Sequence, residues 1–122
     1  MIEGIVNADL EAMIAVTIHG PGGVRAVDAL IDTGFNGALS LPSALISDLQ
    51  LPWRQTGWAV LADDSRILVD LFEASVEWHG AERRVYVDEG CSTALLGMSL
   101  LEGSHLRINV VEAGRLAIEE LP

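Results

Sequence analysis

The sequence predicts an all-β fold, because short apolar runs rich in β-branched residues recur at roughly ten-residue spacing between turn-forming segments. Gly20-Pro21-Gly22-Gly23 and Ala62-Asp63-Asp64-Ser65 are the clearest of these turns. Half of the residues are hydrophobic, which allows a compact core without disulfides or metals. The 122 residues fit one domain, so we expect residues 1–122 to form a single sandwich or barrel.

The first half of the chain predicts strands and one short helix. Ile5-Val6 is a brief apolar run, and the apolar segments within Ala12 to Ile31 flank the first glycine-rich turn, which predicts a β-hairpin. Leu39-Ser40-Leu41 is expected to be extended. The segment from Pro42 to Leu49 has apolar residues at helical spacing, and proline suits the first turn of a helix.

The second half predicts three further hairpins and a second short helix. The polar turn at residues 62–65 joins two of the strands, while His79-Gly80 and Ala113-Gly114 mark the other turns. Leu95 to Leu101 predicts a strand that enters a helix of one or two turns, ending near Gly103. The expected strands of the hairpins are Trp53 to Leu61, Arg66 to Val76, Ala74 to Trp78, Arg83 to Val87, Leu106 to Val111 and Arg115 to Ile118.

The charge balance argues against two classes of partner. The chain has 18 acidic and 7 basic residues and no lysine, a formal net charge of −11, so it lacks the clustered cations that bind nucleic acid or anionic membranes. It also lacks a run of roughly 20 apolar residues that could span a bilayer. Met1-Ile2-Glu3-Gly4 has no basic region or apolar run of a secretory signal. We therefore expect a soluble, cytoplasmic protein.

Cysteine and histidine usage gives no sign of a cofactor or metal. Cys91 is the only cysteine, which excludes an intrachain disulfide, and we expect it to be a small apolar filler. His19, His79 and His105 are far apart and match no metal-ligand spacing. The sequence contains no Gly-x-Ser-x-Gly nucleophile motif.

One motif predicts chemistry. Leu30-Ile31-Asp32-Thr33-Gly34 places a carboxylate where an apolar strand meets a turn, and such a group is costly to desolvate unless hydrogen bonds or function retain it. Thr33 offers a hydroxyl, and Gly34 permits close backbone approach. The simpler interpretation is a strand-ending turn, since all three residues of Asp32-Thr33-Gly34 favour turns.

The chain resembles the retropepsin-like aspartic proteases, particularly their small prokaryotic members. Val27 to Gly34 is similar to the family's apolar strand and catalytic loop, and Ala94 to Leu101 is similar to its second signature, which opens a short helix. The resemblance implies a closed or semi-open barrel in which the segment around Gly97 threads behind the catalytic loop. Two departures are Phe35, where many members have Ala or Ser, and Met98, where retroviral members have Arg.

Aspartic proteolysis needs two carboxylates that share a proton, and this chain has a single Asp-Thr-Gly. The resemblance therefore implies a homodimeric aspartic endopeptidase without a cofactor, acting on a peptide or protein, with Asp32, Thr33 and Gly34 catalytic and Thr33 bonding across the two-fold axis. The terminal segments, Met1 to Val6 and Leu116 to Leu121, are candidate interface strands.

The hairpin from Trp53 to Phe72 corresponds to the family's flap, although it is equally consistent with an ordinary surface hairpin. We expect Trp58 on this hairpin to pack in the core, with a substrate pocket as the alternative. The residues expected to contact substrate are Leu30, Asn36, Gly37, Ala62 and Asp63.

Two other functions remain open. The chain is also consistent with a non-catalytic peptide-binding or assembly module of the same fold, in which Asp32 is a structural acid. A third possibility is a dormant protease domain that a partner or acid activates, because protonation of its many carboxylates relieves repulsion between subunits.

Overall fold

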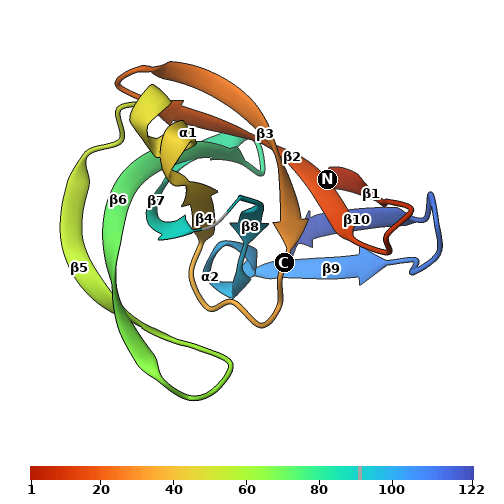
Figure 1. The fold of residues 1–122 in the computed structure, drawn as a ribbon. Coiled ribbons are helices and arrows are strands. Elements are labelled where there is room, and N and C mark those ends of the chain that lie inside the picture. Colours follow the sequence, from red (N-terminus) through yellow and green to blue (C-terminus); the bar gives the residue numbers. More distant parts are fainter. Residues whose placement is uncertain (91) are drawn as a thin grey trace.

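A computed structural model describes residues 1–90 and 92–122, which leaves the expectation for Cys91 outside the described residues. The described chain contains ten strands and two short helices (Figure 1). In order they are β1 (Ile2–Val6), β2 (Ala12–Gly20), β3 (Gly23–Ile31), β4 (Leu39–Pro42), α1 (Ser43–Asp48), β5 (Trp53–Val60), β6 (Arg66–Trp78), β7 (Ala81–Gly90), β8 (Ala94–Leu96), α2 (Met98–Leu101), β9 (Ser104–Ile108) and β10 (Arg115–Glu120).

Six of the strands close into a barrel. The neighbours run β2, β3, β8, β4, β7 and β6, and β6 returns to β2 through the pairs Ile18–Val76 and His19–Ser75. The β3–β8 and β4–β7 pairs are parallel, while the other pairs in the ring are antiparallel. The predicted all-β barrel with short helices is therefore confirmed.

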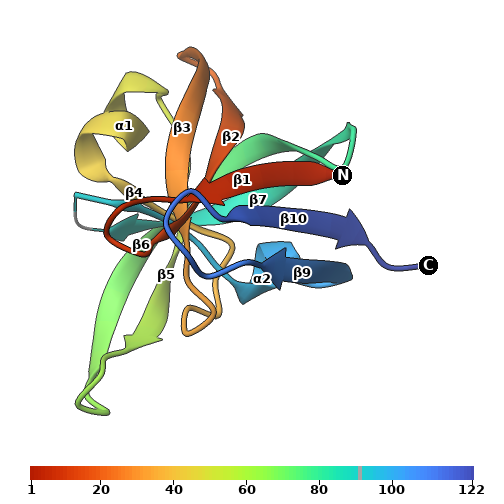
Figure 2. The same ribbon diagram turned by 90° about the vertical axis from the view of Figure 1, so that its right-hand side faces the viewer.

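Two appendages extend from this barrel. Within the part of the chain that the structure describes, β5 pairs only with β6, so the two strands form a long curved hairpin that projects beyond the barrel (Figures 1 and 2). On the other side, β1, β10 and β9 form a small antiparallel extension of the sheet. Both terminal strands are thus paired within the chain. Among the described residues of this extension, the edges that lack a strand partner are the outer edge of β9, one edge of β1 at Ile2–Gly4, and the edge of β10 at Glu119 and Glu120 that faces away from β9.

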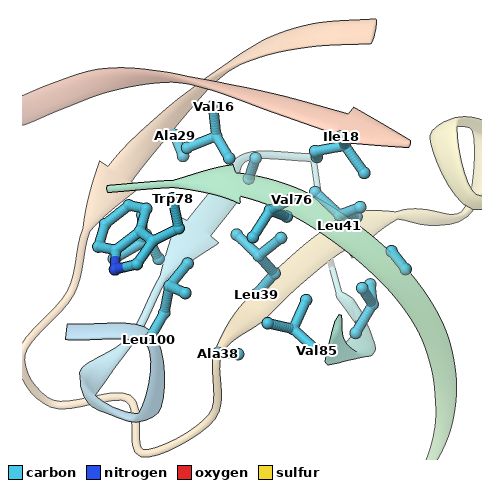
Figure 3. Packing of buried hydrophobic residues seen from close by; sticks show 14 of the residues in the cluster. Val16, Ile18, Ala29, Ala38, Leu39, Leu41, Val76, Trp78, Val85 and Leu100 are labelled. Carbon is cyan, nitrogen blue, oxygen red and sulfur yellow. The ribbon is translucent and has the colours of Figure 1, made fainter. Parts of the chain in front are cut away.

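The core fills the barrel with aliphatic side chains from alternating strand positions, as the period of a β-strand requires (Figure 3). Val16 and Ile18 of β2 face Val76 of β6, and Leu39 and Leu100 pack below them. Leu39, Val76 and Leu100 are fully buried. This core holds together the two strands, β3 and β8, that position the acidic motif.

The predicted elements are present, with differences in their bounds. The strand predicted over Leu106 to Val111 begins earlier and ends at Ile108, and the strand predicted over Arg83 to Val87 extends from Ala81 to Gly90. β6 is one continuous strand from Arg66 to Trp78 that belongs to two hairpins, where the sequence suggested two overlapping strands. Pro42 lies just before α1 with an extended backbone, so the helix begins at Ser43. In the turn between β6 and β7, His79 and Gly80 both have positive φ, as a tight two-residue hairpin turn requires.

Candidate active site

The Asp32 loop begins where β3 ends, and β8 fixes its position. β8 lies between β3 and β4, with Ile31 paired to Leu96 on one side and Leu39 paired to the same residue on the other. The register continues one residue further, because the Asp32 N–H donates to the Leu96 carbonyl over 2.9 Å. Asp32 therefore directly follows β3, a strand that pairs with β2 on one side and with β8 on the other.

A tight turn orients the Asp32 carboxylate. The N–H of Gly34 donates to Oδ1 of Asp32 over 2.9 Å, and the N–H of Phe35 donates to the Asp32 carbonyl over 3.1 Å. The side chain is partly buried, while Thr33 and Gly34 are exposed. A Cβ on Gly34 would lie 3.3 Å from Oδ1 of Asp32, so glycine leaves this oxygen uncrowded. The carboxylate thus has one oxygen held by the backbone at an open surface.

The segment around Gly97 supports the loop from behind, as the resemblance implied. Three backbone hydrogen bonds join the two segments: Gly97 N–H to the Ala38 carbonyl, Met98 N–H to the Phe35 carbonyl and Ser99 N–H to the Gly37 carbonyl, at 2.9, 2.8 and 3.2 Å. A Cβ on Gly97 would lie 2.2 Å from the Gly37 carbonyl oxygen. Only glycine allows so close an approach, which explains this residue in the second motif.

Phe35, which departs from the usual family pattern, fills space that two glycines leave open. A Cβ on Gly37 would lie 2.5 Å from Cζ of Phe35, and one on Gly97 would lie 2.5 Å from its Cδ2. The Phe35 ring therefore packs against Gly37 of the loop and Gly97 of the supporting segment. The sequence alone did not indicate this role. The sequence contains both the large side chain and the two glycines that make room for it. Their relation becomes visible only when the Asp32 loop and the Gly97 segment lie side by side.

An open groove lies beside Thr33. Its volume is about 530 Å³, and its lining combines the motif, α2 and the start of β9: Thr33, Asn36, Met98, Ser99, Leu101, Glu102, Gly103, Ser104 and Leu106. The side chain of Met98 is exposed at 45%, so part of this lining is apolar and uncovered. Among the described residues, the Thr33 hydroxyl makes no hydrogen bond.

The inner face of the β5–β6 hairpin carries exposed apolar side chains. Val76 and Phe72 face the barrel interior, and Leu68 lies on the same face of β6 because side chains alternate along a strand. Leu68 is paired with Trp58, and Val60 follows on the same face of β5. Trp58, Val60 and Leu68 are 67%, 65% and 60% exposed. The expectation that Trp58 packs in the core is therefore wrong, because the hairpin extends past the core.

The tip of this hairpin is a polar turn. The Ser65 hydroxyl and N–H both donate to Oδ1 of Asp63, and the hydroxyl contact is the main reason why the pKa of Asp63 lies below its usual range. Both views place the hairpin tip and the loop between β3 and β4 at the same end of the barrel (Figures 1 and 2). This arrangement places Ala62 and Asp63 on the side of the molecule that carries Asp32.

The structure separates the residues expected to contact substrate into three groups. Asn36 is exposed and lines the groove beside Thr33. Gly37 accepts the Ser99 N–H under the Phe35 ring, and Leu30 is paired with Met13 and Leu95, so these two residues build the scaffold of the loop. Ala62 and Asp63 lie at the hairpin tip.

The described residues contain no group of three His, Cys, Asp or Glu side chains that could hold a metal ion. In the same residues, no helix is long and apolar enough to cross a membrane.

Comparison with known proteins supports the architecture. The structure is similar to the crystal structure of a retropepsin-like aspartic protease from Rickettsia conorii, with a TM-score of 0.58 and 20% sequence identity over 98% of this chain and 89% of that chain. No protein-family model and no curated protein matches the sequence. An identity of 20% shows the fold alone. The chain therefore has the retropepsin-like, all-β fold that its two motifs resemble.

Proposed function

We propose that this protein is an aspartic endopeptidase that works as a homodimer, with one Asp32 from each subunit. The observation that carries the proposal is the loop itself: an accessible carboxylate, oriented by the Gly34 N–H and supported through Gly97, beside an open groove. The sequence contains a single Asp-Thr-Gly, so a pair of such aspartates requires a second copy of the chain.

In the proposed reaction, two Asp32 carboxylates near the two-fold axis share one proton, because two adjacent negative charges repel each other strongly. The ionised carboxylate removes a proton from a water molecule, which attacks the scissile carbonyl carbon. The protonated partner donates a hydrogen bond to the carbonyl oxygen. The carboxyl group that took the water proton then gives it to the amide nitrogen, and the C–N bond breaks as the oxyanion re-forms a carbonyl. The products are a carboxylic acid and an amine, and the pair again holds one proton.

The groove beside Thr33 is the proposed seat of the second subunit. Two chains at −11 each would carry −22, so association has to come from apolar contact and hydrogen bonds. Met98, Leu101 and Leu106 supply apolar lining, and the Thr33 hydroxyl is available to bond across the axis. This interface would bring the two Asp32 loops together.

The β5–β6 hairpin is the proposed flap. Its exposed inner face of Trp58, Val60 and Leu68 would cover a bound peptide, exclude water and contact apolar substrate side chains. A strand-like peptide would also pair with backbone groups. We therefore expect cleavage of extended segments with apolar residues near the scissile bond.

The test is the Asp32→Asn variant, assayed by mass spectrometry of an unfolded protein library after incubation with the full chain. Asn keeps the shape but cannot take up the proton, so turnover should fall to background, while circular dichroism and sedimentation remain unchanged. Asp28→Asn is a matched control, since Asp28 is an exposed acid on the same strand; it should retain activity. Cleavage by Asp32→Asn at the wild-type rate would refute the mechanism. An inactive wild-type dimer that binds peptides would instead favour the non-catalytic binding module.

A further inference from the structure

A second cleft lies at the opposite end of β3 from Asp32. Its volume is about 270 Å³, and it is lined by His19, Gly20, Pro21, Pro52, Arg54, Glu73, Ala74, Ser75 and Arg84. β3 has nine residues, which at about 3.3 Å per residue places the two ends roughly 26 Å apart. The cleft is therefore separate from the Asp32 loop, and its size suits one small polar group.

The floor of this cleft is a row of polar side chains across three strands. His19 of β2 is paired with Ser75 of β6, which is paired in turn with Arg84 of β7. The neighbouring residues Ala74 and Val76 are buried in the core, so the alternation of the strand turns Ser75 and its partners outward. An imidazole, a hydroxyl and a guanidinium thus share one line of the outer surface.

A β-bulge adds a second guanidinium. The register of β5 against β6 shifts between Trp53 and Gln55, which leaves Arg54 as the extra residue. Bulges redirect side chains and are frequent beside functional sites. Here the bulge turns Arg54 to the outer face, where its Nε donates a hydrogen bond to Oε2 of Glu73. Without the bulge, Arg54 would not share this face with Arg84.

Glu73 holds the two arginines but does not use up their hydrogen-bonding capacity. Its Oε2 contacts Nε of Arg54, and its Oε1 lies 3.1 Å from Nε of Arg84. A guanidinium has five N–H donors, and across residues 1–90 and 92–122 neither arginine makes a further side-chain hydrogen bond. Arg54, Arg84 and Glu73 together carry +1, within a chain whose net charge is −11. Glu77, whose Oε1 lies 3.5 Å from Nε2 of His19, is a further acid and lowers the charge at the His19 side of the cleft.

We propose that this cleft binds an oxyanion, the carboxylate or phosphate of a ligand, between Arg54 and Arg84. The free guanidinium edges match the planar, bidentate geometry that such oxygens accept, and the Ser75 hydroxyl lines the same cleft as a further donor. Glu73 acts as the internal counter-ion that contacts both arginines and lowers the net charge of the site. The proposal does not depend on the chemistry at Asp32.

The test is a nuclear magnetic resonance titration of the full chain with inorganic phosphate and, separately, with acetate, at constant ionic strength set by chloride. The arginine Nε–H signals of Arg54 and Arg84 should shift in a saturable way. Arg107 is the internal control, because it also contacts one glutamate, with Nη2 2.9 Å from Oε1 of Glu119, but it lies on the remote β9–β10 hairpin. Its signal should not respond.

Two substitutions with opposite expected effects separate an anion site from a simple strand-to-strand ion pair. Arg84→Gln removes one of the two guanidinium groups and should weaken phosphate binding about tenfold. Glu73→Gln removes the competing carboxylate and should tighten phosphate binding by about the same factor. Arg107→Gln should change nothing. The side chain of Arg84 is 81% exposed, so its replacement should leave the fold intact, which circular dichroism verifies.

The proposal fails if all arginine signals shift alike, or if binding is the same in Arg84→Gln, Glu73→Gln and the unmodified protein. The Arg54–Glu73–Arg84 cluster would then serve only to tie β5, β6 and β7 together. Short peptides that carry either glutamate or phosphoserine distinguish the two oxyanions. Saturable binding of either peptide supports the site, and binding of neither, like the absence of phosphate and acetate binding, overturns it.

Discussion

Replacing Gly97 by Ala should damage both stability and activity, because this glycine is where the second motif touches the Asp32 loop. The added Cβ would lie 2.2 Å from the Gly37 carbonyl oxygen and 2.6 Å from that of Phe35. These neighbours are backbone atoms, so relief requires the loop and the start of α2 to separate by about 1 Å. That movement strains the three hydrogen bonds that Gly97, Met98 and Ser99 donate to the loop.

The magnitude follows from two effects. Overpacking a well-packed site costs about 1–3 kcal/mol, and weakening the three hydrogen bonds adds roughly 1–2 kcal/mol. The free energy of unfolding should therefore fall by about 2–5 kcal/mol. For a domain of this size 1 kcal/mol corresponds to roughly 4 °C, so Tm should fall by about 8–20 °C. Proteolysis by the proposed dimer should also be lost, because the Asp32 loop moves.

The assay is thermal unfolding followed by circular dichroism, with Gly57→Ala as the matched control. A Cβ on Gly57 would lie 3.0 Å from Cδ1 of Leu71, which is the end of a flexible side chain and can move away. That variant should change Tm by less than about 4 °C. If Gly97→Ala is as stable as Gly57→Ala, the loop is not held by the close contact, and the account of the second motif is wrong.

Three further predictions concern a half-buried acid, the core and the interface. Burial raises the pKa of Asp88 above its usual 3.8, so its charged form costs folding free energy at neutral pH, and this cost disappears as the pH falls through the raised pKa. Asp88→Asn should therefore increase Tm at pH 7, and this increase should vanish once the pH falls below the pKa that Asp88 has in the unfolded chain. An increase in Tm that is the same at every pH would show that burial does not raise the pKa of Asp88. Leu39 is fully buried, so Leu39→Ala should lower the free energy of unfolding by about 2–5 kcal/mol in urea with an unchanged m-value; a loss under 1 kcal/mol would show that the site collapses freely. Thr33→Ala should weaken self-association about 30-fold in sedimentation equilibrium, since each of two hydroxyls loses a hydrogen bond worth about 1 kcal/mol, while an unchanged dissociation constant would remove Thr33 from the interface.

The sequence predicted the strands well because local signals and the final packing agree. The hairpin from Ala12 to Ile31 has a glycine-rich turn between β-branched runs, and the fold keeps that pattern. Asp32-Thr33-Gly34 was recognisable because an acid after an apolar strand is unusual. In these segments, the local sequence signal agrees with the contacts that the rest of the chain supplies.

The features that sequence reasoning missed depend on contacts between distant segments. Phe35 occupies space left by Gly37 and Gly97, which are adjacent only after β8 has entered between β3 and β4. Trp58 is exposed because the β5–β6 hairpin extends past the barrel, although its own strand pattern resembles a core strand. The bulge at Arg54 depends on the register between β5 and β6, which local composition does not specify.

The most direct test of the central claim is the binding stoichiometry of a non-cleavable peptide that carries a secondary hydroxyl in place of the scissile amide. Isothermal titration calorimetry on the intact protein gives the number of inhibitors per chain. A site built from two Asp32 carboxylates predicts one inhibitor for two chains, and no binding in Asp32→Asn. One inhibitor per chain, or equal binding by the Asn variant, would contradict the shared carboxylate pair.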